Sequence, residues 1–180
     1  GADPLMIKYH DEEWGVPCHD DRKLFEYIVL DTFQAGLSWA IVLNKRENFR
    51  RAFDDFDPEE IASYAFKRIR ELESNAGIIR NKLKIAATVS NAQAFLAIQK
   101  EFGTFDRYIW SFVRRKPIVN QHQKYLDIGA TSPESDAMSI DLKKRGFKFV
   151  GSTICYAFMQ GAGLVNDHLL SCFRYNEVQI

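Results

Sequence analysis

Apolar residues recur at intervals of three and four along almost the whole chain, which restricts it to folds built from amphipathic helices. The run that follows the potential cap Asp20-Asp21 shows the pattern most clearly. Its apolar side chains that share one helical face are Leu24, Tyr27, Ile28 and Phe33. Few stretches alternate with a period of two, and the short segment 147–150 is the exception. We therefore predict an all-α protein.

Start and stop signals divide the chain into a series of helices. Capping side chains, proline in a first turn and glycine after a last turn set the expected bounds. Besides the helix after Asp20-Asp21, helices are expected from Ser38 through Val42 and Phe49 towards Phe53, from Asp57-Pro58, over 66–74, from Asn81 to about Glu101, from Ser132-Pro133 to Gly146, and from 151–153 to Gly161 and Gly163. We find no repeat and no low-complexity linker between them.

Composition excludes several classes of protein. At 180 residues the chain can bury one sizeable core, and no run approaches the ~18 apolar residues of a membrane span. No signal peptide is visible, and three cysteines without a disulfide-scaffold pattern indicate a reduced, cytoplasmic protein. Motifs of kinases, α/β-hydrolases and zincins are missing from the sequence.

The formal net charge is zero, so a surface for nucleic acid would have to be local. Three basic runs can supply one: Arg50-Arg51, Arg114-Arg115-Lys116 and Lys143-Lys144-Arg145. The alternative for each run is a solvated helix face.

The stretch DTFQAGLSW, residues 31–39, combines a carboxylate, a helix break and a tryptophan. Ala35-Gly36 interrupts the helical pattern and leaves Leu37 exposed at the break. The stretch is either a corner between two helices or the wall of a pocket. Enzymes that act on a nucleobase hold it between aromatic faces. Most aromatic residues of the chain must belong to the core, but Tyr9 and Trp39 lie near polar groups rather than in purely apolar runs, so both interpretations stay open.

A turn that contains Gly77 links two expected helices over residues 74–81. Such a turn can direct backbone N–H groups at a phosphate, aided by the positive end of the following helix. This is the logic of the helix-hairpin-helix element that binds DNA. The usual form is richer in glycine, so a plain connector is the alternative.

His168 and Cys172 are four residues apart, a spacing that places both on one face of a helix and suits a zinc ion. A structural zinc takes four ligands, and His10 is a candidate for the third. Cys18 and His19 are also available, but as neighbours they are poorly placed to bind one ion together. The alternative is a packed thiol beside a surface histidine.

Four blocks occur in one order along the chain: DPLMIKYHDEEWGVP, QAGLSWAIVLNKRENFR, AGIIRNKLKI and KKRGFKFVGSTICYAFMQGAGLVNDH. They resemble the bacterial DNA-3-methyladenine glycosylase I family from Asp3 to about Cys172. That family is all-α, contains the helix-hairpin-helix element and excises 3-methyladenine from alkylated DNA. The resemblance implies a monofunctional N-glycosyl hydrolase that acts, as a monomer, on double-stranded DNA containing alkylated bases. It implies no membrane and no protein partner.

The resemblance also implies a base pocket. It places Tyr9, Asp31 and Trp39 at the pocket positions, with Trp14 nearby and Asp31 as the catalytic residue. Two departures reshape the pocket. Asp31 stands where members of the family have a glutamate, and Met6 stands where an aromatic residue is common.

Contacts with DNA follow from the same resemblance. Gly36-Leu37 would be the probe that enters the duplex where the damaged base has left. The alternative is that these residues only form a corner between two helices. Segment 74–81 would be the hairpin that anchors the DNA. Its expected contact residues, with the start of the next helix, are Gly77, Ile79, Arg80 and Lys82.

For the metal, the resemblance makes His10, His168 and Cys172 three of four ligands to a structural zinc. The fourth family ligand is a cysteine that precedes the first residue of this sequence. Such a site would tie the N-terminal segment to a C-terminal helix. We expect one compact unit over 1–180, with a division into subdomains at about 20–130 and 1–19 plus 131–180 as a further possibility, the pocket lying between the two.

Residues Lys82 to Lys100 contain no acid, although other helix-hairpin-helix glycosylases place a catalytic aspartate about twenty residues beyond the hairpin. Glu101 and Asp106 come later and out of register. This predicts selective capture of a labile, cationic base rather than forceful cleavage of a stable one. The alternatives are a glycosylase for another alkylated purine and a non-catalytic lesion-binding protein on the same fold.

Overall fold

The computed structural model describes residues 3–179, and these confirm the predominantly helical class. The strands of this part of the chain are one short parallel pair, β1 (Ile118–Val119) and β2 (Val165–Asn166). The α-helices are α1 (Pro4–Glu12), α2 (Asp21–Gln34), α3 (Trp39–Leu43), α4 (Arg46–Ala52), α5 (Pro58–Ala62), α6 (Phe66–Ser74), α7 (Lys82–Phe102), α8 (Phe105–Ile109), α9 (Pro133–Lys144), α10 (Ser152–Gly161) and α11 (Arg174–Glu177). Short 3-10 turns are η1 (Asp54–Phe56), η2 (Trp110–Val113) and η3 (Tyr125–Asp127).

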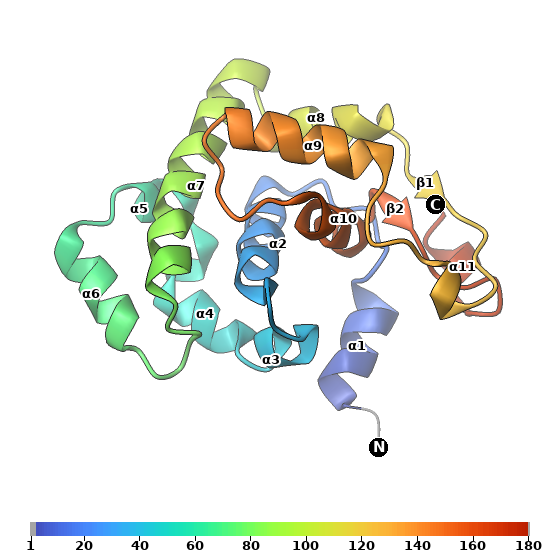
Figure 1. Cartoon of the computed structure of the whole chain (residues 1–180), viewed down its shortest axis with the longest axis horizontal. Helices are drawn as coiled ribbons and strands as arrows, with labels where there is room; N and C mark the ends of the chain where they lie inside the picture. The colour runs from blue at the N-terminus through green and yellow to red at the C-terminus, as the bar shows by residue number, and fades with distance from the viewer. Residues whose placement is uncertain (1–2, 180) are drawn as a thin grey trace.

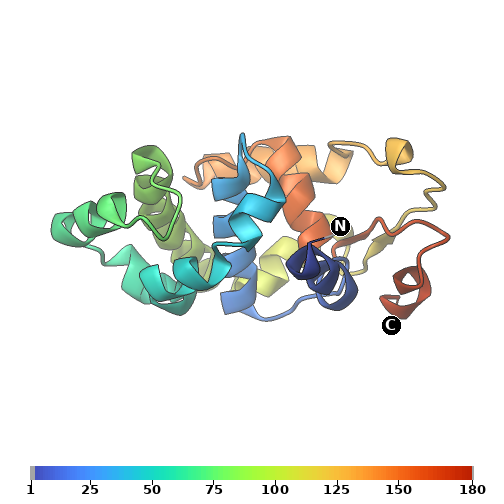
Figure 2. The ribbon, with the colours of Figure 1, turned by 90° about the horizontal axis from the view of Figure 1, so that it is seen from below.

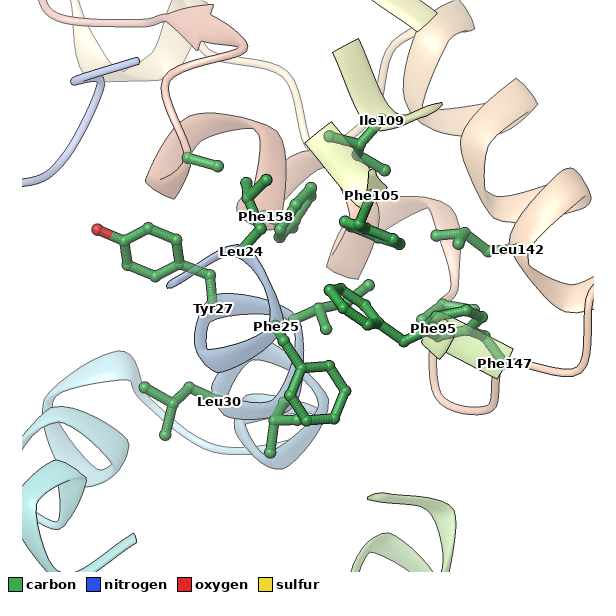
Figure 3. Packing of buried hydrophobic residues seen from close by; sticks show 14 of the residues in the cluster. Leu24, Phe25, Tyr27, Leu30, Phe95, Phe105, Ile109, Leu142, Phe147 and Phe158 are labelled. Atoms are coloured by element: carbon green, nitrogen blue, oxygen red, sulfur yellow. The ribbon is translucent and has the colours of Figure 1, made fainter. Parts of the chain in front are cut away.

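Helix α2 is the centre of the molecule. The sequence predicted one apolar face, but every residue from Leu24 to Phe33 is buried, because helices pack against α2 from several sides. In both views α6 lies on one side of α2 and α1 on the other (Figures 1 and 2). Phe25 of α2 contacts Phe95 of α7, with ring centroids 4.9 Å apart, and Phe158 of α10 lies nearby (Figure 3). Near the C-terminal end of α2, Phe33 packs against Phe49 of α4 with ring centroids 4.7 Å apart, so this end is buried as well.

Local capping explains why most predicted bounds are confirmed. Asp20 accepts a hydrogen bond from the N–H of Lys23 at the start of α2, and Asn81 accepts one from the N–H of Lys84 at the start of α7. Gly103 ends α7 with a positive φ of 89°. The helix predicted over 66–74 is α6.

The predicted helix from Ser38 towards Phe53 is wrong. The run from Ser38 towards Phe53 is two helices, α3 and α4, and Ser38 makes no capping hydrogen bond with its side chain. The break lies at Asn44, whose Nδ2 donates to the carbonyl of Ala40 and to the carboxylate of Asp3. Lys45 then reaches away to the carbonyl of Gly77. Contacts with distant segments therefore override the helical pattern.

The segment 147–150 is a loop despite its alternating pattern. Asn91 of α7 bonds both the N–H and the carbonyl of Lys148, and Phe149 has a positive φ of 58°. These bonds occupy backbone groups that a strand partner would need. Within residues 3–179, no helix is both long and apolar enough to cross a membrane.

Candidate active site

A cavity of about 290 Å³ opens where α1, the end of α2, the start of α3 and α10 meet. Its lining residues are Met6, Tyr9, His10, Trp14, Asp31, Gln34, Trp39, Tyr125, Ala157 and Gln160. The structure therefore brings together all four residues that were expected to form a base pocket, from three separate segments of the chain.

Asp31 lies in the last turn of α2 and is 5% exposed. Among the described residues it has no hydrogen-bond or ion-pair partner, so it neither caps a helix nor joins a salt bridge. Its unpartnered oxygens are not enclosed by protein, and the residue lines the cavity. Burial raises the pKa of Asp31 well above its ordinary value. Asp31 therefore offers the cavity a carboxyl group that can bind a hydrogen-bond donor or a positive charge.

Two aromatic side chains flank this carboxylate. The ring centroids of Tyr9 and Trp39 are 5.1 Å apart and the rings are tilted by 49°. Burial, together with the charges of Asp31 and Glu13, raises the pKa of the Tyr9 hydroxyl, so this group stays protonated. The indole Nε1 of Trp39 is enclosed and has no hydrogen-bond partner among the described residues. Aromatic faces beside an acid favour a flat cationic guest.

An ion-pair network holds α1, and with it Tyr9, against the rest of the fold. Arg46 of α4 donates from both terminal nitrogens to Glu13, each at 2.8 Å, and from Nε to Glu26 at 2.6 Å. Although burial alone would raise the pKa of Glu13, the hydrogen bonds and charge of Arg46, with Lys23, lower it to about 2. A charged, bidentate pair fixes position as well as distance.

Residues 1–175 match the sequence model of the methyladenine glycosylase family. This chain belongs to the methyladenine glycosylase family. It is 51% identical over 173 residues to DNA-3-methyladenine glycosylase 1 of Escherichia coli (strain K12), a match that covers 96% of this chain and 92% of that protein.

Solved structures agree with this family assignment. A crystal structure of 3-methyladenine DNA glycosylase I superposes with a TM-score of 0.94 at 53% identity and covers 96% of this chain and 95% of its own. A variant of 3-methyladenine DNA glycosylase I in complex with 3-methyladenine also has a TM-score of 0.94, at 34% identity, with 100% and 95% covered.

The three expected metal ligands of this methyladenine glycosylase family member converge, as predicted. The Sγ of Cys172 lies 3.6 Å from Nε2 of His10 and 3.5 Å from Nδ1 of His168. The second ring nitrogen of His10 bonds Asp11 at 2.7 Å, and that of His168 bonds the carbonyl of Trp14 at 2.9 Å. Trp14 also packs edge-on against His168, and both Trp14 and His10 line the cavity, so the cluster lies next to it.

The local structure of the cluster differs from the prediction. His168 and Cys172 do not share a helix face; they lie in an irregular segment over 167–173 that precedes α11. The side chain of Asn166 accepts from the N–H of His168, and the carbonyl of His122 accepts from the N–H of Leu170. These hydrogen bonds take the place of the regular backbone hydrogen bonds that a helix would form. Turn geometry, rather than helical spacing, brings the two ligand atoms together.

The helix break after α2 is held in place by a lysine of α7. Lys84 of α7 is buried, and its Nζ donates to the carbonyl of Phe33 at 2.9 Å and to that of Ala35 at 2.6 Å. The carbonyls at the C-terminal end of a helix carry partial negative charge, which the ammonium offsets. Gly36 follows with a φ of 82°, and Leu37 is 40% exposed. The bonds from Lys84 therefore hold in place the turn that presents the exposed Leu37 side chain.

Segment 74–81 links α6 to α7, but one backbone group that was expected to meet a phosphate is already bonded within the protein. The N–H of Gly77 donates to Asn75 Oδ1 at 2.8 Å, so it is not free for a phosphate. The N–H groups of Ile79 and Arg80 have no acceptor in the part of the chain that the structure describes. Ile79 is half-buried, whereas the side chains of Arg80 and Lys82 are exposed.

Sequence reasoning missed several lining residues, above all Gln160 and Tyr125. Gln160 is an amide in an otherwise apolar last turn of α10, and a polar residue in such a run was a usable signal. Tyr125 comes from η3, within an irregular stretch that no periodicity describes.

Proposed function

We propose that this protein is a DNA-3-methyladenine glycosylase, which flips the damaged nucleotide out of alkylated DNA and removes the base by hydrolysis. The observation that carries the proposal is the buried carboxylate of Asp31, which has no partner among the described residues and lines one cavity with the aromatic rings of Tyr9 and Trp39. The relatives named above are glycosylases for this base, and one of them is solved with 3-methyladenine bound.

Methylation at N3 places a positive charge on adenine and weakens its bond to the sugar. Aromatic faces attract a desolvated cation by roughly 2 kcal/mol. The Asp31 carboxylate adds charge attraction and accepts hydrogen bonds from the adenine edge. Normal adenine is neutral and gains less from both contacts. The pocket can therefore select the lesion, after flipping has cost a few kcal/mol.

Bond cleavage then needs little acid catalysis. As the C1′–N9 bond breaks, its electron pair leaves with the base, and the base departs neutral. Water supplies a hydroxyl group to C1′ and releases a proton, which leaves an abasic site. No lysine lines the cavity among the described residues, so a Schiff-base route has no placed nucleophile.

We expect chromatography of methylated DNA treated with this protein to show free 3-methyladenine, with the strand left intact. Strand cleavage trapped by borohydride would contradict the monofunctional assignment. Absence of any released base would favour a lesion-binding protein, and predominant release of 7-methylguanine a different alkylpurine glycosylase.

We propose that Leu37 fills the space that the flipped base leaves in the duplex. Gly36 forms the turn that exposes Leu37. Leu37→Ala should lower base release from double-stranded DNA about tenfold, because a wedge that offsets the cost of unstacking is lost. Release from single-stranded DNA should change less. Ile140→Ala on α9, another exposed aliphatic side chain, is the matched control and should leave both rates unchanged. Equal losses on the two substrates would argue against a wedge.

Segment 74–81 is proposed as the DNA anchor of a helix-hairpin-helix element. The free N–H groups of Ile79 and Arg80 and the exposed charges of Arg80 and Lys82 support this role. The pocket is proposed to lie between subdomains 20–130 and 1–19 plus 131–180, since its lining comes from both parts. A monomeric state and a cytoplasmic location stay predictions.

His10, His168 and Cys172 are proposed to hold a structural zinc with the cysteine that precedes this sequence in the family. Two imidazole nitrogens and a thiol that face one another fit zinc, and the bonds to Asp11 and the Trp14 carbonyl orient both rings. Bound zinc would supply a cross-link between α1 and the turn over 167–173.

We expect zinc to be found in the purified protein by elemental analysis, and chelation to lower its melting temperature. Cys172→Ser should lose the metal. Cys18→Ser is the matched control, because Cys18 faces the carbonyl of Asp20 away from the cluster, and it should retain zinc. Equal metal content in both variants would refute the ligand assignment.

A further inference from the structure

Charge alone does not identify 3-methyladenine. A 7-methylguanine nucleotide also carries a positive charge, so aromatic walls and an acid attract both bases. The two differ at position 6, where adenine presents an amino donor and guanine a carbonyl acceptor. A pocket that discriminates between the two bases needs, besides a negative charge, a group that distinguishes a hydrogen-bond donor from an acceptor at position 6.

A buried carboxylate next to the cavity orients such a group. The side chain of Asp167 is 0% exposed. Its hydrogen bonds come from Asn120 Nδ2 at 2.7 Å, His122 Nε2 at 3.0 Å, Tyr156 Oη at 2.8 Å and Gln160 Nε2 at 2.7 Å. A carboxylate only accepts hydrogen bonds. Gln160 must therefore turn its NH₂ group towards Asp167.

This constraint fixes what Gln160 offers to the cavity. Its Oε1 has no donor among the described residues and is not enclosed by protein. Gln160 lines the same cavity as Asp31. An amide that is free to rotate can present either a donor or an acceptor, but this amide is held with its acceptor free.

We propose that Gln160, oriented by Asp167, is a specificity-determining residue whose Oε1 accepts a hydrogen bond from the 6-amino group of methylated adenine. The O6 atom of a methylated guanine would meet this oxygen as a second acceptor and be rejected. A buried polar group rejects the wrong partner because the mismatch leaves it without a hydrogen bond. The inference rests on the proposed glycosylase function and adds the group that reads the purine edge.

The test measures 3-methyladenine and 7-methylguanine released from the same methylated DNA. Gln160→Met keeps a similar volume without the amide and should lower the ratio of 3-methyladenine to 7-methylguanine about tenfold, the effect of one hydrogen bond. Asp167→Asn should also lower the ratio, because an asparagine NH₂ can bond Oε1 and let Gln160 turn its own NH₂ into the cavity. Its release of 7-methylguanine should rise.

Tyr156→Phe is the matched control. It removes one of the four hydrogen bonds to Asp167 and leaves the bond to Gln160, so the ratio should stay at the parent value. General loss of structure would lower both rates together and leave the ratio unchanged. If Gln160→Met does not fold, Gln160→Ala gives the same comparison.

The outcomes distinguish a failure of the glycosylase function from a failure of the role of Gln160. A parent protein that releases neither base overturns the glycosylase function itself. A parent that releases 3-methyladenine, with folded Gln160 variants at the parent ratio, overturns only the role of Gln160. An unchanged ratio in folded Asp167→Asn overturns the role of Asp167 as its orienting group.

Discussion

Asp31→Asn should reduce release of 3-methyladenine about a hundredfold, because the variant loses a charged acceptor facing a cationic base. The asparagine has nearly the same shape, so the fold should persist. Asp31→Glu is the matched control, since it restores the carboxylate with one more methylene and should retain most activity. Release by Asp31→Asn at the parent rate would refute the pocket assignment.

The same substitution should make the protein more stable at neutral pH. Burial raises the pKa of Asp31 in the folded state above its unfolded value, so the folded protein binds the proton more tightly. The stability from protonated Asp31 is fully present below the unfolded pKa and is lost as pH rises through the folded pKa. Asp31→Asn avoids this loss. Its advantage in melting temperature should therefore vanish in acid and grow as pH rises.

Gly163→Ala should lower the free energy of unfolding by roughly 2–6 kcal/mol, the sum of backbone strain and overpacking. Gly163 has a φ of 71°, and a Cβ there would lie 2.3 Å from the carbonyl carbon of Val16 and 2.4 Å from the nitrogen of Pro17. Both are backbone atoms, which cannot rotate away. The contact joins the end of α10 to the segment after α1, so both sides of the cavity depend on it.

Gly146→Ala separates the two causes. Gly146 has a φ of 100°, but a Cβ there would have no atom within 4 Å, so this variant suffers strain alone. Urea denaturation should show a clearly larger loss for Gly163→Ala. Equal losses would mean that residues 16–17 move aside at little cost.

Elements with local causes were predictable. The caps at Asp20, Asn81 and Ser132 act within a few residues, and a reader of the sequence alone can place the helices that they begin. The break at Asn44 was not predictable, because it depends on Asp3 and on the hairpin loop, which are distant in sequence. For the same reason the sequence did not show that α2 is buried on every side.

The sequence predicted that Tyr9, Trp14, Asp31 and Trp39 would lie together, but it did not predict the hydrogen bonds around them. Tyr9, Asp31 and Trp39 were assigned through a family resemblance, which carries three-dimensional information that spacing lacks. The bond between Gln160 and Asp167 joins the end of α10 to the residue after β2, and no helical or strand periodicity in the sequence indicates it. The partners of Lys84, two backbone carbonyls some fifty residues away in sequence, are equally invisible without a fold.

Asp31 has no partner within residues 3–179, and this also affects how the reaction ends. In the proposed mechanism, a cationic base compensates the buried carboxylate before cleavage. When the glycosidic bond breaks, the base becomes neutral and this compensation disappears, so the carboxylate again favours contact with water. Cleavage therefore weakens the hold on the product at the moment it forms. If Asp31 has this role, release of the base needs no separate structural element, because cleavage itself removes the positive charge that the carboxylate binds.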